Sequence, residues 1–245
     1  MLIKPDSELR RIPVKLPPSD AVFIEGIRVC LEMIDLAHTR LQQTLVSMEG
    51  CCIAKQPLPD GLCASAMLDA WSLVDSIHRL ADLAERFPRV RDKKHIPGFV
   101  LLRKNTVEIN TLRNFIQHLS EQIRNVTTDS PTWSVWGALS WCSVDPETTV
   151  LHTSTFLCGK AVTGAVRTLV NPLGKKLRLP IGLITLTQDT VEVCLSDLMD
   201  DVERFAATIE SMISHTFQAH SEFTERYAAD VVIGLVGKAI PPEHK

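Results

Sequence analysis

The sequence lacks any apolar run of the ~18 residues that a membrane span needs. Its first residues, MLIKPDSELRRIPVKLPPSD, carry charges and prolines where a secretory leader would have an apolar core. The most apolar stretch of the tail, AADVVIGLVGKAI from Ala228, is too short and contains Asp230 and Lys238. We therefore expect a cytoplasmic protein that does not enter a membrane.

Paired cysteines that could bind a metal are absent as well. The chain has seven cysteines, an odd number, and none of them forms C-x-x-C, the spacing of zinc knuckles and thioredoxin-type pairs. The adjacent Cys51 and Cys52 leave two alternatives, a redox-active pair or a reduced structural pair. H-E-x-x-H, G-x-S-x-G and P-loop motifs are also missing, so we expect no metal and no cofactor.

The chain has little excess charge. Its 26 Lys and Arg residues against 29 Asp and Glu residues give a formal net charge of −3, which disfavours tight, sequence-independent binding to long nucleic acid. The net charge does not exclude a local basic patch, because residues 86–104 contain one acid, Asp92, among many cations. This cluster either guides a phosphate chain or is a solvated loop. Its cations are Arg86, Arg89, Arg91, Lys93, Lys94, Arg103 and Lys104.

Apolar residues make up 45% of the chain and charged residues 22%, so we expect a globular fold. Apolar positions that recur at steps of three and four predict four helices, over residues 20–48, 62–87, 99–126 and 196–227. Gly50 and Pro88 are the expected stops of the first two helices. The third helix has the most regular seam, made of Ile109, Leu112, Ile116, Leu119, Ile123 and Val126.

Between residues 132 and 195 the sequence turns to β-branched and aromatic residues, which favour strands. SVWGALSWCSV and ETTVLHTSTFLCG flank the turn signal Asp145-Pro146 and predict one hairpin. GLITLTQ and TVEVCLSD predict a second hairpin that turns near Asp189. The stretch between the two hairpins is compatible with loop or strand.

The expected fold class is α+β, mostly α: a four-helix bundle with a small antiparallel β insertion between the third and fourth helices. Its parts are an extended arm over residues 1–18, three long helices over 19–131, the insertion over 132–195, and the fourth helix with the tail over 196–245. The alternative is a three-helix unit followed by a separate β-plus-helix domain. We favour one compact domain, because a fourth helix best covers the apolar stripes of the other three.

One hexapeptide of the third helix, RNFIQH, sets an arginine, an amide and an imidazole opposite the apolar seam. On an ideal helix that advances ~100° per residue, Arg113 and His118 lie ~140° apart, whereas Asn114 and His118 stack at i and i+4. An ordinary exposed face is mostly Glu and Lys, but this one suits a hydrogen-bonded, partly enclosed surface. Its members are Asn110, Arg113, Asn114, Gln117, His118, Glu121 and Arg124.

Arg113 and His118 are the candidate catalytic residues. Arginine binds phosphate bidentately at any physiological pH, and histidine exchanges a proton near neutrality. Together they suit metal-free cleavage of an RNA phosphodiester, with the imidazole as general acid or base and the guanidinium stabilising the phosphorane. Arg113-Asn114-x-x-x-His118 resembles the signature of the HEPN superfamily of helical-bundle RNases and nucleic-acid-associated proteins. The resemblance implies a symmetric homodimer in which two such helices form one composite site.

Candidate binding residues surround this pair. They are Asn110, Asn114 and Gln117 on the same face, His78 on the second helix, and Arg103 and Lys104 near the start of the third. Asp75 and Arg79, at i and i+4, predict a surface ion pair. The functional hypothesis is a metal-independent endoribonuclease, or an inactive relative that binds RNA. The alternative is a non-enzymatic homodimeric module that binds a protein through the polar face and the β insertion.

Overall fold

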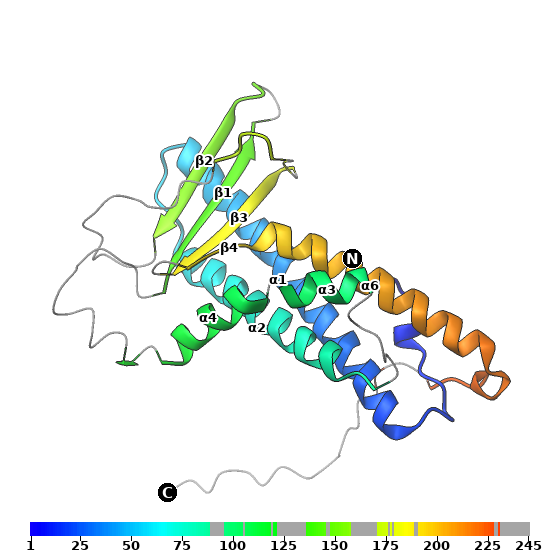
Figure 1. Ribbon diagram of the computed structural model, residues 1–245. Coiled ribbons are helices and arrows are strands. Elements are labelled where there is room, and N and C mark those ends of the chain that lie inside the picture. The colour runs from blue at the N-terminus through cyan, green and yellow to red at the C-terminus, as the bar shows by residue number, and fades with distance from the viewer. Residues whose placement is uncertain are drawn as a thin grey trace, which may run out of the picture.

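The computed structural model describes residues 1–88, 96–104, 106–118, 120–121, 136–145, 148–157, 171–175, 177, 179–188, 191–227 and 230. The expected class is confirmed: the described chain is mostly helical and has a small, four-stranded antiparallel sheet (Figure 1). All four strands fall between the helices α4 and α6 in the sequence. Among the described residues, no helix combines the length and the apolarity needed to cross a membrane.

The two longest helices of the first half, α1 (Pro18–Ile53) and α2 (Leu62–Arg86), pack along each other. α2 has nearly its predicted bounds, but α1 runs past Gly50, the predicted stop. The helix ends instead at Ile53, and Lys55, just beyond the cap residue Ala54, has a left-handed φ of 52° that lets the N–H of Gln56 reach Cys51 O at 2.9 Å. Gly50 is exposed in the last turns of the helix, where a glycine costs about 1 kcal/mol but does not end the helix by itself.

The third helix differs from the prediction. Instead of one helix over 99–126, two shorter helices follow each other, α3 (Pro97–Lys104) and α4 (Thr106–Gln117). The two pack on different partners. α3 lies on α6, where the ring centroids of Phe99 and Phe205 are 5.0 Å apart, whereas α4 lies on α2. At the junction, Thr106 Oγ1 donates to the carbonyl of Arg103 at 2.6 Å. Where a single helix over 99–126 was expected, the described residues therefore form two helices that have different main packing partners.

The predicted seam of this helix is realised in α4 over its described length. Ile109 and Leu112 are fully buried, and Ile116 is half-buried. The remaining seam positions, Leu119, Ile123 and Val126, lie outside the described residues.

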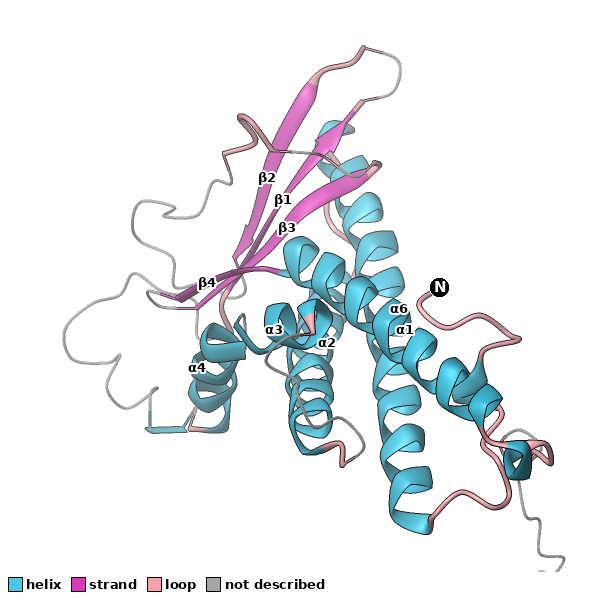
Figure 2. Ribbon diagram, turned by 45° about the vertical axis from the view of Figure 1, so that its right-hand side comes forward, coloured by secondary structure: helices cyan, strands magenta, loops and turns pink. Residues whose placement is uncertain are grey.

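Both predicted hairpins are confirmed. β1 (Ala138–Val144) pairs with β2 (Leu151–Leu157), and β3 (Ile181–Gln188) pairs with β4 (Val191–Cys194). β1 also pairs with β3, which gives the order β2-β1-β3-β4. Figures 1 and 2 show this sheet at one end of the molecule, beside the C-terminal end of α1. There Trp141 of β1 donates its Nε1–H to the buried Glu49 of α1 at 3.0 Å, so the sheet is attached to the helices by a specific contact.

The last helix, α6 (Leu195–Ala219), ends earlier than predicted and is followed by the 3-10 helix η3 (Ser221–Phe223). Residues 1–18, expected as an extended arm, contain the 3-10 helix η1 (Glu8–Arg10) and bury three apolar side chains, Ile3, Leu9 and Leu16. One continuous apolar core joins these residues to the helices and to the inward face of the sheet.

Candidate functional site

α4 packs on α2, and the two helices are antiparallel. Most of the described polar face of α4 is exposed, so the expectation of a partly enclosed surface is wrong; Arg113, at the edge of this face, is half-buried. The order of the contacts shows this direction, because Arg113 on α4 meets Asp75 near the middle of α2, while Asn110 shares a pocket with His78 one turn further along α2. The same order continues through the end of α3, where Arg103 lies 3.9 Å from Glu85. We call this line of polar contacts between α2 and α3–α4 the polar seam.

Arg113 is held firmly within the polar seam. Its Nε donates to Asp75 Oδ1 at 3.0 Å, and Asp75 Oδ2 forms an ion pair with Arg79 Nη2 at 2.7 Å. Both partners are about one-third exposed, with 30% for the Arg113 side chain and 35% for that of Asp75. Asp75 therefore pairs with two arginines, one from each helix. Because the contact with Asp75 uses Nε, the N–H groups of the two η nitrogens of Arg113 are left to bind other acceptors.

His118 lies just beyond the end of α4 and is well exposed, with 62% of its side chain accessible. Its backbone N–H continues the helical bonding to Asn114 O at 3.1 Å, and its Nδ1 stands 3.5 Å from a carboxylate oxygen of Glu121. No recorded contact joins His118 to Arg113 within one chain, among the described residues. Arg113 and His118 of one chain are thus not in direct contact.

Three of the predicted binding residues meet in one pocket of about 240 Å³, between α2, α3 and α4. His78 lines the pocket, and its buried Nδ1 has no hydrogen-bond partner among the described residues; Asp82 Oδ2, also in the lining, lies 3.9 Å from it. Asn110 and Arg103 stand at the exposed rim, and Thr106 lies between them. The apolar side of the pocket comes from Ala81, Ala84, Phe99 and Leu102. Sequence reasoning found these polar residues one by one, but not that they share a cavity.

The other predicted binding residues are not gathered in this pocket. Asn114 and Gln117 are exposed on α4, and Lys104 is exposed in the last turn of α3. Arg86 and Arg103 are exposed as well, and Arg103 is paired with Glu85. The remaining cations of the predicted basic cluster, residues 89–94, lie outside the described residues.

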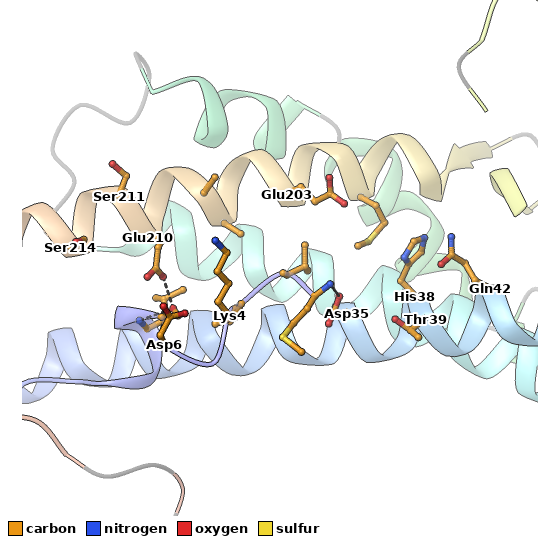
Figure 3. Close-up of a pocket in the computed structure, with 18 of the residues that line it drawn as sticks. Lys4, Asp6, Asp35, His38, Thr39, Gln42, Glu203, Glu210, Ser211 and Ser214 are labelled. Carbon is orange, nitrogen blue, oxygen red and sulfur yellow. Dashed lines mark hydrogen bonds and ion pairs between the residues drawn. The ribbon is translucent and has the colours of Figure 1, made fainter. Parts of the chain in front are cut away.

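A larger cavity, of about 1090 Å³, was not anticipated from the sequence. It lies between residues 1–9, α1 and α6, and Figure 3 shows His38, Thr39 and Gln42 of α1 along it, opposite Glu203 and Glu210 of α6. Much of its polar lining fixes the N-terminal segment. Glu210 accepts from the Ser7 hydroxyl at 2.5 Å and from the Glu8 N–H at 2.8 Å, and Asp35 lies 3.4 Å from the terminal amine. The sequence signal for this docking is the pair of apolar residues Ile3, beside Lys4, and Leu9, between Glu8 and Arg10.

Metal and thiol chemistry find little support in the described part of the chain. Its residues contain no group of three His, Cys, Asp or Glu side chains placed to hold a metal ion. Cys51 and Cys52 are both free thiols. Partial burial, together with the charge of Glu49, raises the pKa of the Cys52 thiol, which disfavours the reactive thiolate.

The candidate site is therefore the polar seam, which carries a fixed arginine, a small pocket with an unpartnered imidazole nitrogen, and an exposed histidine at the end of α4. Comparison of the chain with models of known protein families, with curated proteins and with solved structures finds no match to any of them.

Proposed function

We propose that the protein is a metal-independent endoribonuclease that works as a homodimer, as the HEPN-like pattern Arg113-Asn114-x-x-x-His118 implies. The observation that carries the proposal is the fixed position of Arg113. Asp75 binds its Nε, which orients the guanidinium and leaves the η nitrogens for a phosphate. A cation that is oriented before the substrate arrives stabilises the charge of a transition state better than a mobile one does.

His118 supplies the proton transfers in this proposal. Its imidazole takes the proton from a ribose 2′-hydroxyl, whose oxygen then attacks the neighbouring phosphorus. The bond from phosphorus to the 5′-oxygen breaks, and that oxygen receives a proton from a second imidazole. The products are a 2′,3′-cyclic phosphate and a 5′-hydroxyl end, so no water, metal or cofactor is consumed in the step.

A second copy of the chain removes the geometric difficulty of the site. Arg113 and His118 lie ~140° apart on one ideal helix, so they do not converge on a single phosphate. The exposure of His118 at the end of α4 leaves its side chain available to a partner's site. In the dimer, each phosphate is contacted by an arginine and by histidines from two helices that face each other.

The test compares single-stranded RNA with the same sequence made entirely of 2′-deoxynucleotides, both with EDTA present. The proposal predicts that the protein cleaves the RNA, that the deoxy strand resists, and that the 3′ fragments begin with a 5′-hydroxyl. Cleavage of the deoxy strand at a similar rate, or an absolute requirement for a divalent metal, would contradict it. The His118→Ala variant should lose this cleavage. His215→Ala is its matched control, because His215 is exposed on α6, away from the polar seam.

The non-enzymatic homodimeric module remains a second candidate, and a feature of α1 favours it. Val22, Val29, Met33 and Leu36 are all exposed, with Val22 at 71% and Leu36 at 59%, and they are spaced by seven, four and three residues. Steps of this kind form an apolar stripe like the seam of a coiled coil, so the partner we propose is α1 of a second copy.

Size-exclusion chromatography with light scattering tests whether the α1 stripe is a dimer interface. The α1 stripe predicts a mass of twice 27.3 kDa that falls to 27.3 kDa in the Met33→Glu, Leu36→Glu variant. If that variant stays dimeric and still cleaves RNA, the α1 stripe is not the interface. A wild-type monomer at micromolar concentration would contradict both candidates.

A further inference from the structure

The chain that follows α6 returns to the N-terminal segment. Residues 225–227 pair antiparallel with residues 12–14, and the N–H of Tyr227 donates to Ile12 O at 2.9 Å. An antiparallel partner runs back along its neighbour, so the chain beyond Tyr227 is directed toward Arg10. Arg10 forms an ion pair with α1, and the pairing therefore turns the chain toward that helix.

Three residues beyond Tyr227, Asp230 contacts α1. Its carboxylate forms an ion pair with Arg28 Nη2 at 2.5 Å, and only 6% of the Arg28 side chain is exposed. Glu25 and Glu32 pair with the same guanidinium, so Asp230 joins a buried cation that α1 already holds. The chain thus reaches residue 230 at a defined point in the first half of α1.

An apolar groove of about 790 Å³ lies at this point, between residues 10–12, α1 and the segment that carries Tyr227. Asp230 is part of its lining. Val22 and Val29, which also line it, belong to the exposed apolar stripe of α1 that continues to Leu36. Exposed apolar surface of this kind marks a contact with another segment or chain. The apolar lining consists of Ile12, Ala21, Val22, Gly26, Val29 and Tyr227.

The residues that follow Asp230 match this groove in chemistry and length. Residues 231–240 have the sequence VVIGLVGKAI, which contains one charge, Lys238, and they lie outside the described residues. Fully extended, such a segment reaches at most ~35 Å, whereas Val22 and Leu36 lie ~21 Å apart along a helix. Because the segment is tethered at Asp230, its effective concentration at the groove is of the order of millimolar, which favours it over a separate partner.

We propose that residues 231–240 dock in this groove and along the stripe of α1 in the same chain, held at one end by the Asp230–Arg28 ion pair. The apolar side chains of the segment cover Val22 and Val29 and remove apolar area from water. These two valines would also lie in the α1 interface of the homodimeric module, so the docked segment and a second copy exclude each other there. This docking does not depend on the proposed nuclease activity.

The rate of cleavage after Lys238 by endoproteinase Lys-C, followed by mass spectrometry on the full-length protein, measures the docking. A docked segment is cut only while it is out of the groove, so wild-type cleavage should be slow. The Val232→Asp, Leu235→Asp variant should be cut at least about tenfold faster, because carboxylates oppose burial. The matched control, Pro242→Asp, His244→Asp, adds two carboxylates beyond the segment and should stay within about threefold of wild type.

Val22→Asp tests the groove from the side of α1. Val22 is 71% exposed, so the change should leave circular dichroism unchanged and speed cleavage after Lys238 by at least about fivefold. Equal cleavage rates in the wild type and the Val232→Asp, Leu235→Asp variant, or no effect of Val22→Asp, would overturn the proposal. Protection that weakens on dilution from about 100 µM to about 1 µM would place the segment on a second copy and would overturn it too.

Discussion

Arg113 donates its Nε–H to Asp75 across 3.0 Å, and this hydrogen bond joins α4 to α2 at the centre of the polar seam. Ion pairs at this exposure stabilise a fold by about 1 kcal/mol or less. Asp75→Asn should therefore lower the free energy of unfolding by no more than about 1 kcal/mol. The same change should slow RNA cleavage by at least about tenfold, because the guanidinium loses its fixed orientation. Urea unfolding and single-turnover cleavage measure the two effects.

Arg79→Gln is the control for that prediction. It removes the other arginine of Asp75 and leaves the bond to Arg113 in place, so cleavage should stay within about threefold of wild type. If Asp75→Asn and Arg79→Gln slow cleavage equally, Asp75 does not act by orienting Arg113, and net charge at the seam is the better explanation.

Glu49 holds the sheet to the end of α1. Its Oε2 accepts from Trp141 Nε1 at 3.0 Å and from Ser154 Oγ at 2.6 Å, and the residue is buried. Glu49→Ala leaves both donors without their acceptor, which should lower the free energy of unfolding by about 2 kcal/mol. Glu49→Gln keeps an acceptor oxygen and should lose less. Urea unfolding of the two variants decides: equal losses would mean that the hydrogen bonds contribute little and that packing dominates.

Asp69 should make stability depend on pH. Burial raises the pKa of its carboxyl, and the guanidinium of Arg40, 3.3 Å away, opposes this only in part. A raised pKa in the folded state means that the carboxyl favours folding at low pH and that this contribution is lost as pH rises through the folded pKa. Asp69→Asn should therefore gain stability relative to wild type between about pH 4 and pH 7. Urea unfolding at about pH 4 and about pH 7 measures the difference in unfolding free energy between the variant and wild type. If the variant becomes less stable relative to wild type at the higher pH, the prediction is contradicted.

The helix pattern of the sequence predicts α2, the start of α6 and both hairpins, because each depends on signals within one segment. The packing of α3 on α6 and of α4 on α2 depends on contacts across the molecule. Phe99 lies on α6 while Ile109 and Leu112 are buried in the core, and the heptad-like steps within the segment carry no sign of these separate partners. The docking of residues 1–9 likewise depends on tertiary contacts. The end of α1 was missed for another reason: its left-handed residue is Lys55, not a glycine.

The candidate site, like the fold, was predictable within one helix but not between helices. A helical projection places Asn110 and Arg113 on the polar face of one helix, but it does not say which helix that face meets. The antiparallel packing of α2 supplies Asp75 and His78, and with them the ion pair and the pocket. In the proposed dimer, Arg113 and His118 act on one phosphate only if a second copy of the chain is suitably placed. The sequence pattern of one chain does not specify that placement.

The most direct test of the central claim is the rate at which His118→Ala cleaves single-stranded RNA in EDTA, with enzyme in excess over substrate. General acid–base groups contribute roughly 10²–10⁴-fold to a rate, so we predict a loss in that range with circular dichroism unchanged. The His215→Ala control should cleave at the wild-type rate. Equal cleavage by the wild-type and His118→Ala proteins, or no cleavage by either, would contradict the proposal that this protein is an endoribonuclease built on Arg113 and His118.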